Sequence, residues 1–159
     1  MSWALCEKRA ALKFRDDKYI DGEKLNHLIN QEMEIIWSDF EENDVDEKLA
    51  AFQRLTDVAG QDDIPQLLAL LESERNGFWE RELLAEPISE LGGAQYLPEL
   101  FEAAEKNRIE GHDNDGLNHF LTEIAWADSK GCERKLREML ANKEFKYQEQ
   151  AEWLLTFCE

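Results

Sequence analysis

Apolar residues along this chain recur at spacings of three and four, and no window alternates between apolar and polar residues as a half-buried strand does. The pattern predicts an all-α protein of seven or eight helices. The longest amphipathic series runs from Leu25 to Phe40 and predicts a helix that starts near Gly22. Residues 3–14 predict a shorter helix with Ser2 as its cap, although the same residues also suit an extended arm.

A repeat of 33 residues organises the middle of the chain. Residues 58–72 align without a gap with residues 91–105, so that the glycines and prolines of the two segments coincide. A turn, a helix start and a set of buried apolar positions therefore recur together. Helix pairs of this length cannot bury their apolar faces alone, and they become stable by stacking on one another.

Glycine and proline mark the ends of several predicted helices. Gly60 ends one helix, and Pro65 lies in the first turn of the next, where its missing N–H is harmless. Pro87 falls inside a predicted helix, and we expect it to cause a kink. The apolar series that predict helices after residue 44 span residues 49–58, 64–71, 78–91, 97–104, 117–127, 136–140 and 153–157.

The two turn motifs resemble those of the HEAT-like helical repeat family. They read Gly60-x-x-x-Ile64-Pro65-x-Leu67-Leu68 and Gly93-x-x-x-Leu97-Pro98-x-Leu100-Phe101. The resemblance covers residues 45–159 and implies a right-handed α-solenoid of antiparallel helix pairs, within a single domain over residues 1–159. Residues 1–44 match no repeat. The family usually has a basic residue near the end of the second helix of each pair, and Glu90 and Asp128 stand in that neighbourhood here.

Net charge narrows the choice of partners. The chain has 36 Asp and Glu against 18 Lys and Arg, a net charge of −18. Residues 16–47 carry a net charge of −10 and residues 57–128 one of −13, whereas residues 1–15 and 129–147 each carry +3. Such a field repels nucleic acid and anionic membranes, so we expect neither as a partner. It suits a basic protein, and the alternative is a well-solvated surface with no partner.

The cysteines and the N-terminus indicate a cytoplasmic protein. Cys6, Cys132 and Cys158 form no C-x-x-C pair and leave an odd cysteine over, which does not suggest a disulfide framework. The first residues contain no apolar stretch of signal-peptide length, and no segment approaches the length of a membrane span.

The loop Gly111–Gly116 (GHDNDG) contains residue types that bind metals, but its spacing does not fit a calcium loop. Aligned on Gly116, the first and twelfth positions would be Gly111 and Thr122, and neither supplies a carboxylate. His112 and His119 have no cysteine or third histidine at a ligand spacing. We therefore expect no metal and no cofactor.

Catalytic motifs are also missing from the sequence. There is no serine in a nucleophile elbow, no glycine-rich phosphate loop, and no fixed partner for Cys132. Carboxylates are so abundant that no acid and base pair can be singled out. These observations favour a non-catalytic protein.

The resemblance places the partner on the second helix of each pair, which lines the concave side of such stacks. With Leu55, Ile88 and Ile124 taken as equivalent core positions, the outward positions form an acidic ridge. Trp126 on that ridge suits a binding hot spot, and the alternative is that the register is off by one and Trp126 belongs to the core. The predicted partner-binding residues are Gln53, Asp57, Trp79, Glu82, Glu86, Glu90, Asn118, Thr122 and Trp126, with Asp39, Glu41, Glu42 and Asp44 of the acidic segment 39–47 as a second surface.

A small acidic helical protein without catalytic residues is typical of a stoichiometric binder of a basic protein. We expect an immunity or inhibitor protein that neutralises a basic, nuclease-type toxin by covering its active site, as a monomer or in a 1:1 complex. The alternative is a HEAT-like scaffold or adaptor in an intracellular complex. A third possibility, a helical-repeat enzyme, would require a pocket lined by ordered acids or cysteine.

Overall fold

The computed structural model describes residues 19–20 and 23–158, and the predicted helix over residues 3–14 lies outside them. In this part of the chain there are eight α-helices, two short 3-10 helices and one hairpin, in which strand β1 (Tyr19–Ile20) pairs antiparallel with β2 (Glu23–Lys24). The predicted all-α class is confirmed. The chain divides into two compact units, unit 1 up to Glu74 and unit 2 from Arg75 onward.

Unit 1 is built on an antiparallel hairpin of α2 (His27–Trp37) and α3 (Val45–Val58), followed by η2 (Gln61–Asp63) and α4 (Ile64–Leu71). Its core is made of apolar residues spaced three and four apart: Ile29, Met33 and Ile36 on α2, Ala51, Phe52 and Leu55 on α3, and Ile64, Leu67, Leu68 and Leu71 on α4.

Helix α2 is shorter than the apolar pattern predicts. It begins after Asn26, whose side chain accepts a hydrogen bond from the Leu28 N–H at 3.2 Å, and it ends at Trp37 because the backbone of Ser38 is extended. Phe40 therefore lies in the following turn, with 63% of its side chain exposed. The apolar series begins before α2, at Leu25, and continues after it, to Phe40. The predicted helix was therefore too long at both ends.

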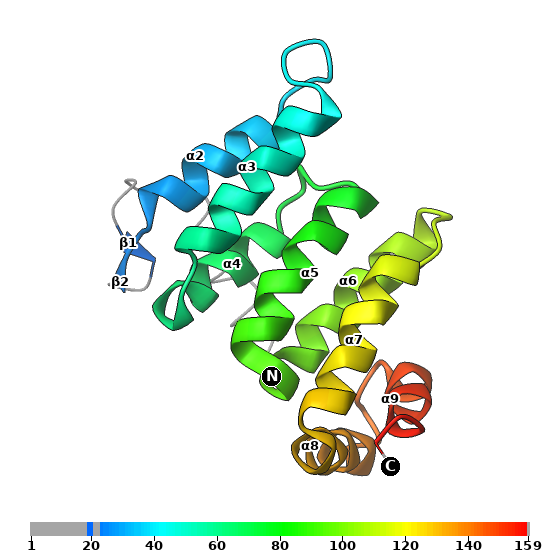
Figure 1. Cartoon of the computed structure of the whole chain (residues 1–159). Helices are drawn as coiled ribbons and strands as arrows, with labels where there is room; N and C mark the ends of the chain where they lie inside the picture. Colours follow the sequence, from blue (N-terminus) through cyan, green and yellow to red (C-terminus); the bar gives the residue numbers. More distant parts are fainter. Residues whose placement is uncertain (1–18, 21–22, 159) are drawn as a thin grey trace. The chain divides into compact units, whose positions relative to one another are not determined.

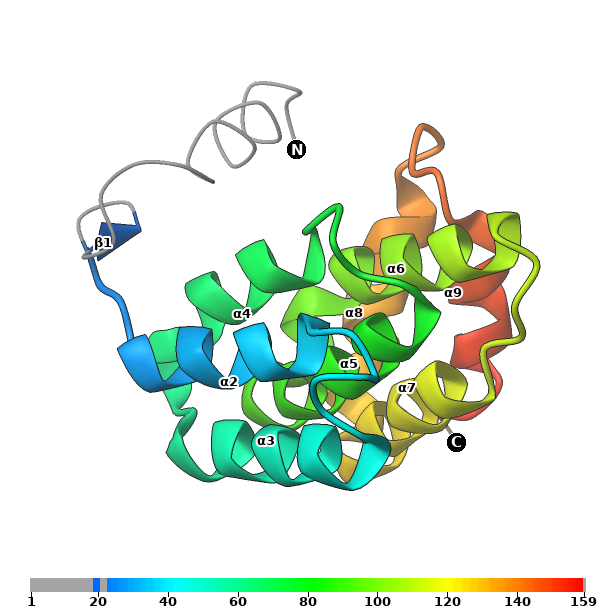
Figure 2. The ribbon, with the colours of Figure 1, turned by 90° about the horizontal axis from the view of Figure 1, so that it is seen from above.

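Unit 2 contains α5 (Phe78–Gly92), η3 (Gly93–Tyr96), α6 (Leu97–Ile109), α7 (Asp115–Ala127), α8 (Ser129–Ala141) and α9 (Gln148–Leu155). Helix α5 packs against α6 and α7, and α7 also packs against α8 and α9 (Figures 1 and 2). The α5 helix continues through Pro87, which is buried. It ends at Gly93, where φ is +55°, a backbone conformation that favours glycine.

The 33-residue repeat is visible in the local structure of both units. Helices α3 and α5 begin 33 residues apart, at Val45 and Phe78, and each is followed by a 3-10 turn and a helix with proline in its first turn. The buried positions of α4, which are Ile64, Leu67, Leu68 and Leu71, coincide at this offset with Leu97, Leu100, Phe101 and Ala104 of α6, and all eight are buried. The repeat therefore includes α3 and α5, which precede the aligned turns, as well as the turns themselves.

A buried cation occupies the same repeat position in α3 and α5. Lys48 donates from Nζ to the carbonyl oxygens of Ile36, at 2.9 Å, and Ser38, so it satisfies carbonyls at the end of α2. Its ammonium also lies 4.3 Å from the centre of the Phe40 ring.

Arg81 stands 33 residues further on. It donates to the Asn107 Oδ1 at 2.6 Å, to the Asn76 carbonyl at 3.1 Å and to Glu110. Both cations thus stabilise their own unit from the inside.

Candidate functional site

A groove of about 760 Å³ lies in unit 2 and is bordered by α5, η3, α7 and α8; we call it the α5–α8 groove. Its charged and titratable lining combines an acidic wall with cations on α8. The lining residues of these types are Glu86 and Glu90 from α5, His119 and Glu123 from α7, Asp128, and Arg134, Lys135 and Glu138 from α8.

The acidic wall is formed by residues spaced four apart on two helices. Glu86 and Glu90 are four residues apart on α5, and His119 and Glu123 are four residues apart on α7, so each pair shares one face of its helix. Because α5 and α7 pack side by side (Figure 1), the two faces border the same groove.

The carboxylates of this wall are close enough to disturb one another. Burial raises the pKa of Glu86, and the nearby charge of Glu90 raises it further, while His119 acts in the opposite direction. Glu86, Glu90 and Glu123 form no ion pair with any residue of the described part of the chain. The acidic wall is therefore open to cations from outside.

The outward positions predicted for α7 are exposed only in part: Ile124 is buried and Trp126 is exposed, as predicted, whereas Thr122 is buried. Helix α7 begins at Asp115, 37 residues after the start of α5 at Phe78, whereas the prediction used an offset of 36. Ala125, next to Ile124, is also buried. The longer offset arises because α6 has 13 residues, against 8 in α4.

Thr122 consequently does not face solvent. Its side chain is 9% exposed, and its hydroxyl donates to the His119 carbonyl at 2.8 Å. Asn118 is half-buried and lines a second groove of about 670 Å³, together with Trp153. The positions of α7 that correspond to Glu82, Glu86 and Glu90 are instead His119, Glu123 and Ala127, which are all exposed.

Glu82 has a structural role at the start of α7. Its carboxylate lies next to Gly116 in the first turn of α7, where the backbone N–H groups of Leu117 and Gly116 favour its ionised form. The residue before the helix, Asn114, makes no capping hydrogen bond of its own, so the Glu82 carboxylate is placed to act as a cap from a neighbouring helix. Burial nevertheless raises its pKa, assisted by the charge of Asp113.

The two candidate tryptophans differ in exposure. Trp126 is 61% exposed, and its ring lies edge-on to Phe157 with 6.5 Å between centroids. Trp79 is half-buried near the start of α5. Trp126 is therefore more accessible to a partner than Trp79.

Unit 1 holds the remaining predicted residues. Gln53 and Asp57 are exposed on α3, where the Gln53 Nε2 donates to the Asp57 Oδ1 at 2.9 Å. They stand 33 residues before Glu86 and Glu90, as the predicted register requires for this pair of helices.

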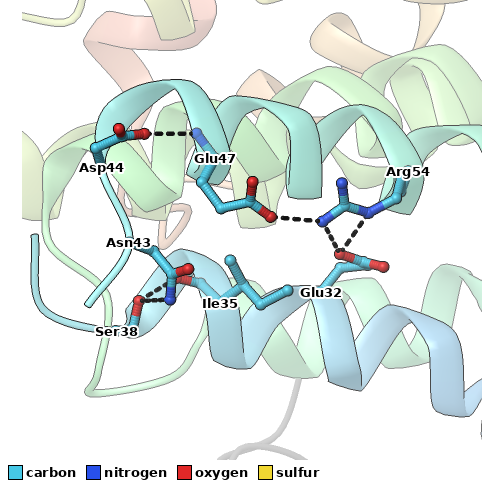
Figure 3. Close-up of polar contacts among 7 residues, drawn as sticks. All are labelled: Glu32, Ile35, Ser38, Asn43, Asp44, Glu47 and Arg54. Atoms are coloured by element: carbon cyan, nitrogen blue, oxygen red, sulfur yellow. Dashed lines mark hydrogen bonds and ion pairs between the residues drawn. The ribbon is translucent and has the colours of Figure 1, made fainter.

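The acidic turn, residues 39–47, joins α2 and α3 in unit 1 (Figure 3). Asp44 accepts from the Glu47 N–H at 2.9 Å and caps α3, and Arg54 bridges Glu47, at 3.4 Å, and Glu32, at 3.0 Å. Four further acids of the turn are exposed and pair with no cation among the described residues: Asp39, Glu41, Glu42 and Asp46. Asp44 and Glu47 thus stabilise the turn, and its other acids are exposed to solvent.

The residue types that suggested a metal have other contacts. His112 stacks on Phe78, with 4.0 Å between ring centroids and 21° between planes. Residues 19–20 and 23–158 contain no group of three or more His, Cys, Asp or Glu side chains placed to hold a metal ion.

The two cysteines of the described chain are not activated. Cys132 and Cys158 are both buried, and burial, followed by a hydrogen bond with Cys158, raises the pKa of Cys132 to about 12. A thiol with so high a pKa stays protonated at neutral pH and is a weak nucleophile.

Sequence reasoning missed the far wall of the groove. His119 and Glu123 could have been found from the four-residue spacing that they share with Glu86 and Glu90. Arg134 and Lys135 could not, because nothing in the sequence relates α8 to the end of α5.

Comparisons of the chain with protein-family models, with curated proteins and with solved structures gave no match. None of the helices within the described ranges has the length and apolar character needed to cross a membrane.

Proposed function

We propose that this chain is a non-catalytic protein-binding module whose partner is a basic protein. The observation that carries the proposal is the acidic wall of the α5–α8 groove, where Glu86, Glu90 and Glu123 gather and form no ion pair with any cation of the described residues. Cationic side chains of a partner would reduce the repulsion between Glu86 and Glu90, so this repulsion favours the binding of a basic partner.

Within this class, an immunity or inhibitor protein is the leading candidate. A nuclease-type toxin has a basic surface where it holds nucleic acid, and an acidic protein of net charge −18 can cover that surface as a monomer in a 1:1 complex. The cytoplasm is the compartment we propose for it. The alternative is a scaffold or adaptor in an intracellular complex, for which a groove with both acids and cations, Arg134 and Lys135, is equally suited.

We also propose that the helix pairs form a HEAT-like solenoid. Support comes from the 33-residue offset between the starts of α3 and α5 and from the packing of α5 on both α6 and α7.

Affinity capture with a matched pair of variants tests the proposed function. The tagged parent, the double variant Glu90→Lys with Glu123→Lys, and the control Asp62→Lys with Glu144→Lys are exposed in parallel to an extract of the source cells. The four positions are exposed and pair with no described cation, so both variants change the net charge equally. A basic protein retained by the parent and the control and lost by the groove variant is the expected result.

Retention of the same proteins by all three forms would contradict the groove assignment, and retention of only acidic or neutral proteins would contradict the basic partner. Nuclease activity of the captured protein, inhibited by an equimolar amount of this chain, distinguishes an immunity protein from an adaptor.

A further inference from the structure

Three aromatic side chains form an exposed cluster in unit 2, which we call the Trp126 cluster: Trp126 on α7, Trp153 on α9 and Phe157 after α9. The Phe157 ring lies edge-on to both tryptophans, 6.5 Å from Trp126 and 5.2 Å from Trp153 between centroids. Trp126 remains 61% exposed and Trp153 37% exposed. A contiguous aromatic surface of this kind is typical of interaction sites, since solvent-facing positions rarely carry several tryptophans.

Carboxylates border the cluster. Glu123 lies three residues before Trp126 on α7, and Glu149 lies four residues before Trp153 on α9, and both acids are exposed. At these spacings each acid shares a helix face with its tryptophan. Glu123 also lines the α5–α8 groove, so the cluster is continuous with the acidic wall described above.

The exposed parts of the two tryptophans are open to a partner. Among residues 23–158, no cation lies over the ring of Trp126, Trp153 or Phe157, whereas Lys48 lies over Phe40 and Lys146 over Tyr147. A tryptophan face next to carboxylates favours a guanidinium in particular, because arginine stacks on aromatic rings and forms two parallel hydrogen bonds to a carboxylate.

We propose that the Trp126 cluster anchors an arginine-bearing segment of the basic partner. The guanidinium stacks on Trp126 and donates to Glu123, while the neighbouring apolar side chain of the same segment covers Trp153. This inference rests on the proposed function, because it assigns the recognition of the basic partner to a defined surface and a defined cation.

Arginine and lysine homopeptides of equal length test the proposal, since they have the same charge and differ in stacking. Dissociation constants are measured by anisotropy of labelled peptides at low salt. The parent should bind the arginine peptide about threefold to tenfold more tightly than the lysine peptide. Trp126→Leu, which keeps an apolar side chain against Phe157, should bring this ratio close to one.

Ile109→Ala is the matched control, because Ile109 is an apolar residue of unit 2 that is 70% exposed and lies outside the cluster. It should leave the ratio of the two affinities unchanged. Equal affinity of the parent for both peptides, or an unchanged ratio in Trp126→Leu, would overturn the anchor.

The two proposals fail in different ways. Salt-sensitive binding of both peptides without a preference for arginine overturns the anchor and leaves the basic partner standing. Binding that neither salt nor Glu90→Lys with Glu123→Lys changes would contradict the basic partner itself. A concentration-dependent dimer that Trp126→Leu abolishes in sedimentation would assign the cluster to a second copy of this chain and overturn the proposal.

Discussion

Lys48 shows how a single charged side chain can stabilise a helix end from within a core. Its stem crosses the apolar contact between α2 and α3, and its ammonium is used on two carbonyls that the end of α2 would otherwise leave without a partner. Buried cations are uncommon because their desolvation is costly, and here two hydrogen bonds and the nearby Phe40 ring offset that cost.

Lys48→Met should therefore destabilise the protein although methionine fills nearly the same space. The carbonyls of Ile36 and Ser38 would lose their donor, at a cost of about 1–3 kcal/mol in the free energy of unfolding. Urea denaturation followed by circular dichroism measures the change, with Lys143→Met at an exposed position as control. Equal midpoints for Lys48→Met and the parent would show that these hydrogen bonds do not contribute.

The acidic wall of the groove predicts an unusual dependence of stability on pH. The pKa of Glu86 is raised above its ordinary value of 4.5, so its ionisation destabilises the folded state as pH rises through the raised pKa. Glu86→Gln should therefore be more stable than the parent at neutral pH, and the difference should vanish below the ordinary pKa. Melting temperatures of both forms from acid to neutral pH provide the test.

Glu105 offers a control of opposite sign. A hydrogen bond from Arg108 lowers the pKa of Glu105, so its ionised form stabilises the protein above the ordinary pKa. Glu105→Gln should be less stable than the parent at neutral pH and equal to it in acid. If Glu86→Gln behaves like Glu105→Gln, the repulsive environment of Glu86 is not present in solution.

At the scale of helices, α7 depends on α5 for its start. Glu82 supplies the cap that Asn114 does not, and Glu82→Ala should cost about 0.5–2 kcal/mol in the free energy of unfolding. Glu90→Ala, at an exposed position two turns further along α5, should leave stability nearly unchanged. Equal stability of the two variants in urea denaturation would contradict the capping role. Glu82 is accordingly unsuitable for tests of binding.

Most helices were predictable because burial follows apolar periodicity closely. The core positions of α4 and α6 follow from the repeat, and the turn glycines and prolines give their starts. The boundaries of α2 were not predictable, since Asn26 and Ser38 end the helix while the apolar series continues. The burial of Thr122 was missed because α6, with 13 residues against 8 in α4, lengthens the interval between helix starts from 33 to 37 residues.

The candidate site was harder to predict from the sequence than the fold. Glu86 and Glu90 follow from their spacing, whereas the cap role of Glu82 depends on a contact with another helix. The buried pair Lys48 and Arg81 does stand at the repeat offset of 33, a signal that the sequence contains. Because Lys and Arg usually lie at the surface, sequence reasoning did not identify the two residues as buried.

On the scale of the whole molecule, the last helix of unit 2 should be essential for stability. Ala151 and Leu154 of α9 are fully buried and cover α7 and α8. Leu154→Ala should cost about 2–5 kcal/mol in the free energy of unfolding, and deletion from Tyr147 onward should destabilise all of unit 2. Thermal melting is the measurement, with Glu152→Ala as the exposed control. An unchanged melting temperature after the deletion would show that α9 is not structural.

Both units present acidic residues to solvent. Unit 1 presents the acidic turn around Glu41 and Glu42, and unit 2 presents the acidic wall with Glu90 and Glu123. Association driven by opposite fields is fast at low salt and weakens once the Debye length falls to about 8 Å. An adaptor that binds through apolar contacts would not respond to salt in this way.

The dissociation constant of the captured partner, measured at increasing salt, tests the central claim most directly. For the parent and for Asp62→Lys with Glu144→Lys, affinity should fall steeply as salt rises past physiological strength. For Glu90→Lys with Glu123→Lys it should be at least about tenfold weaker at low salt and less sensitive to added salt. An affinity that is independent of salt, or a groove variant that binds as tightly as the parent, would contradict the account.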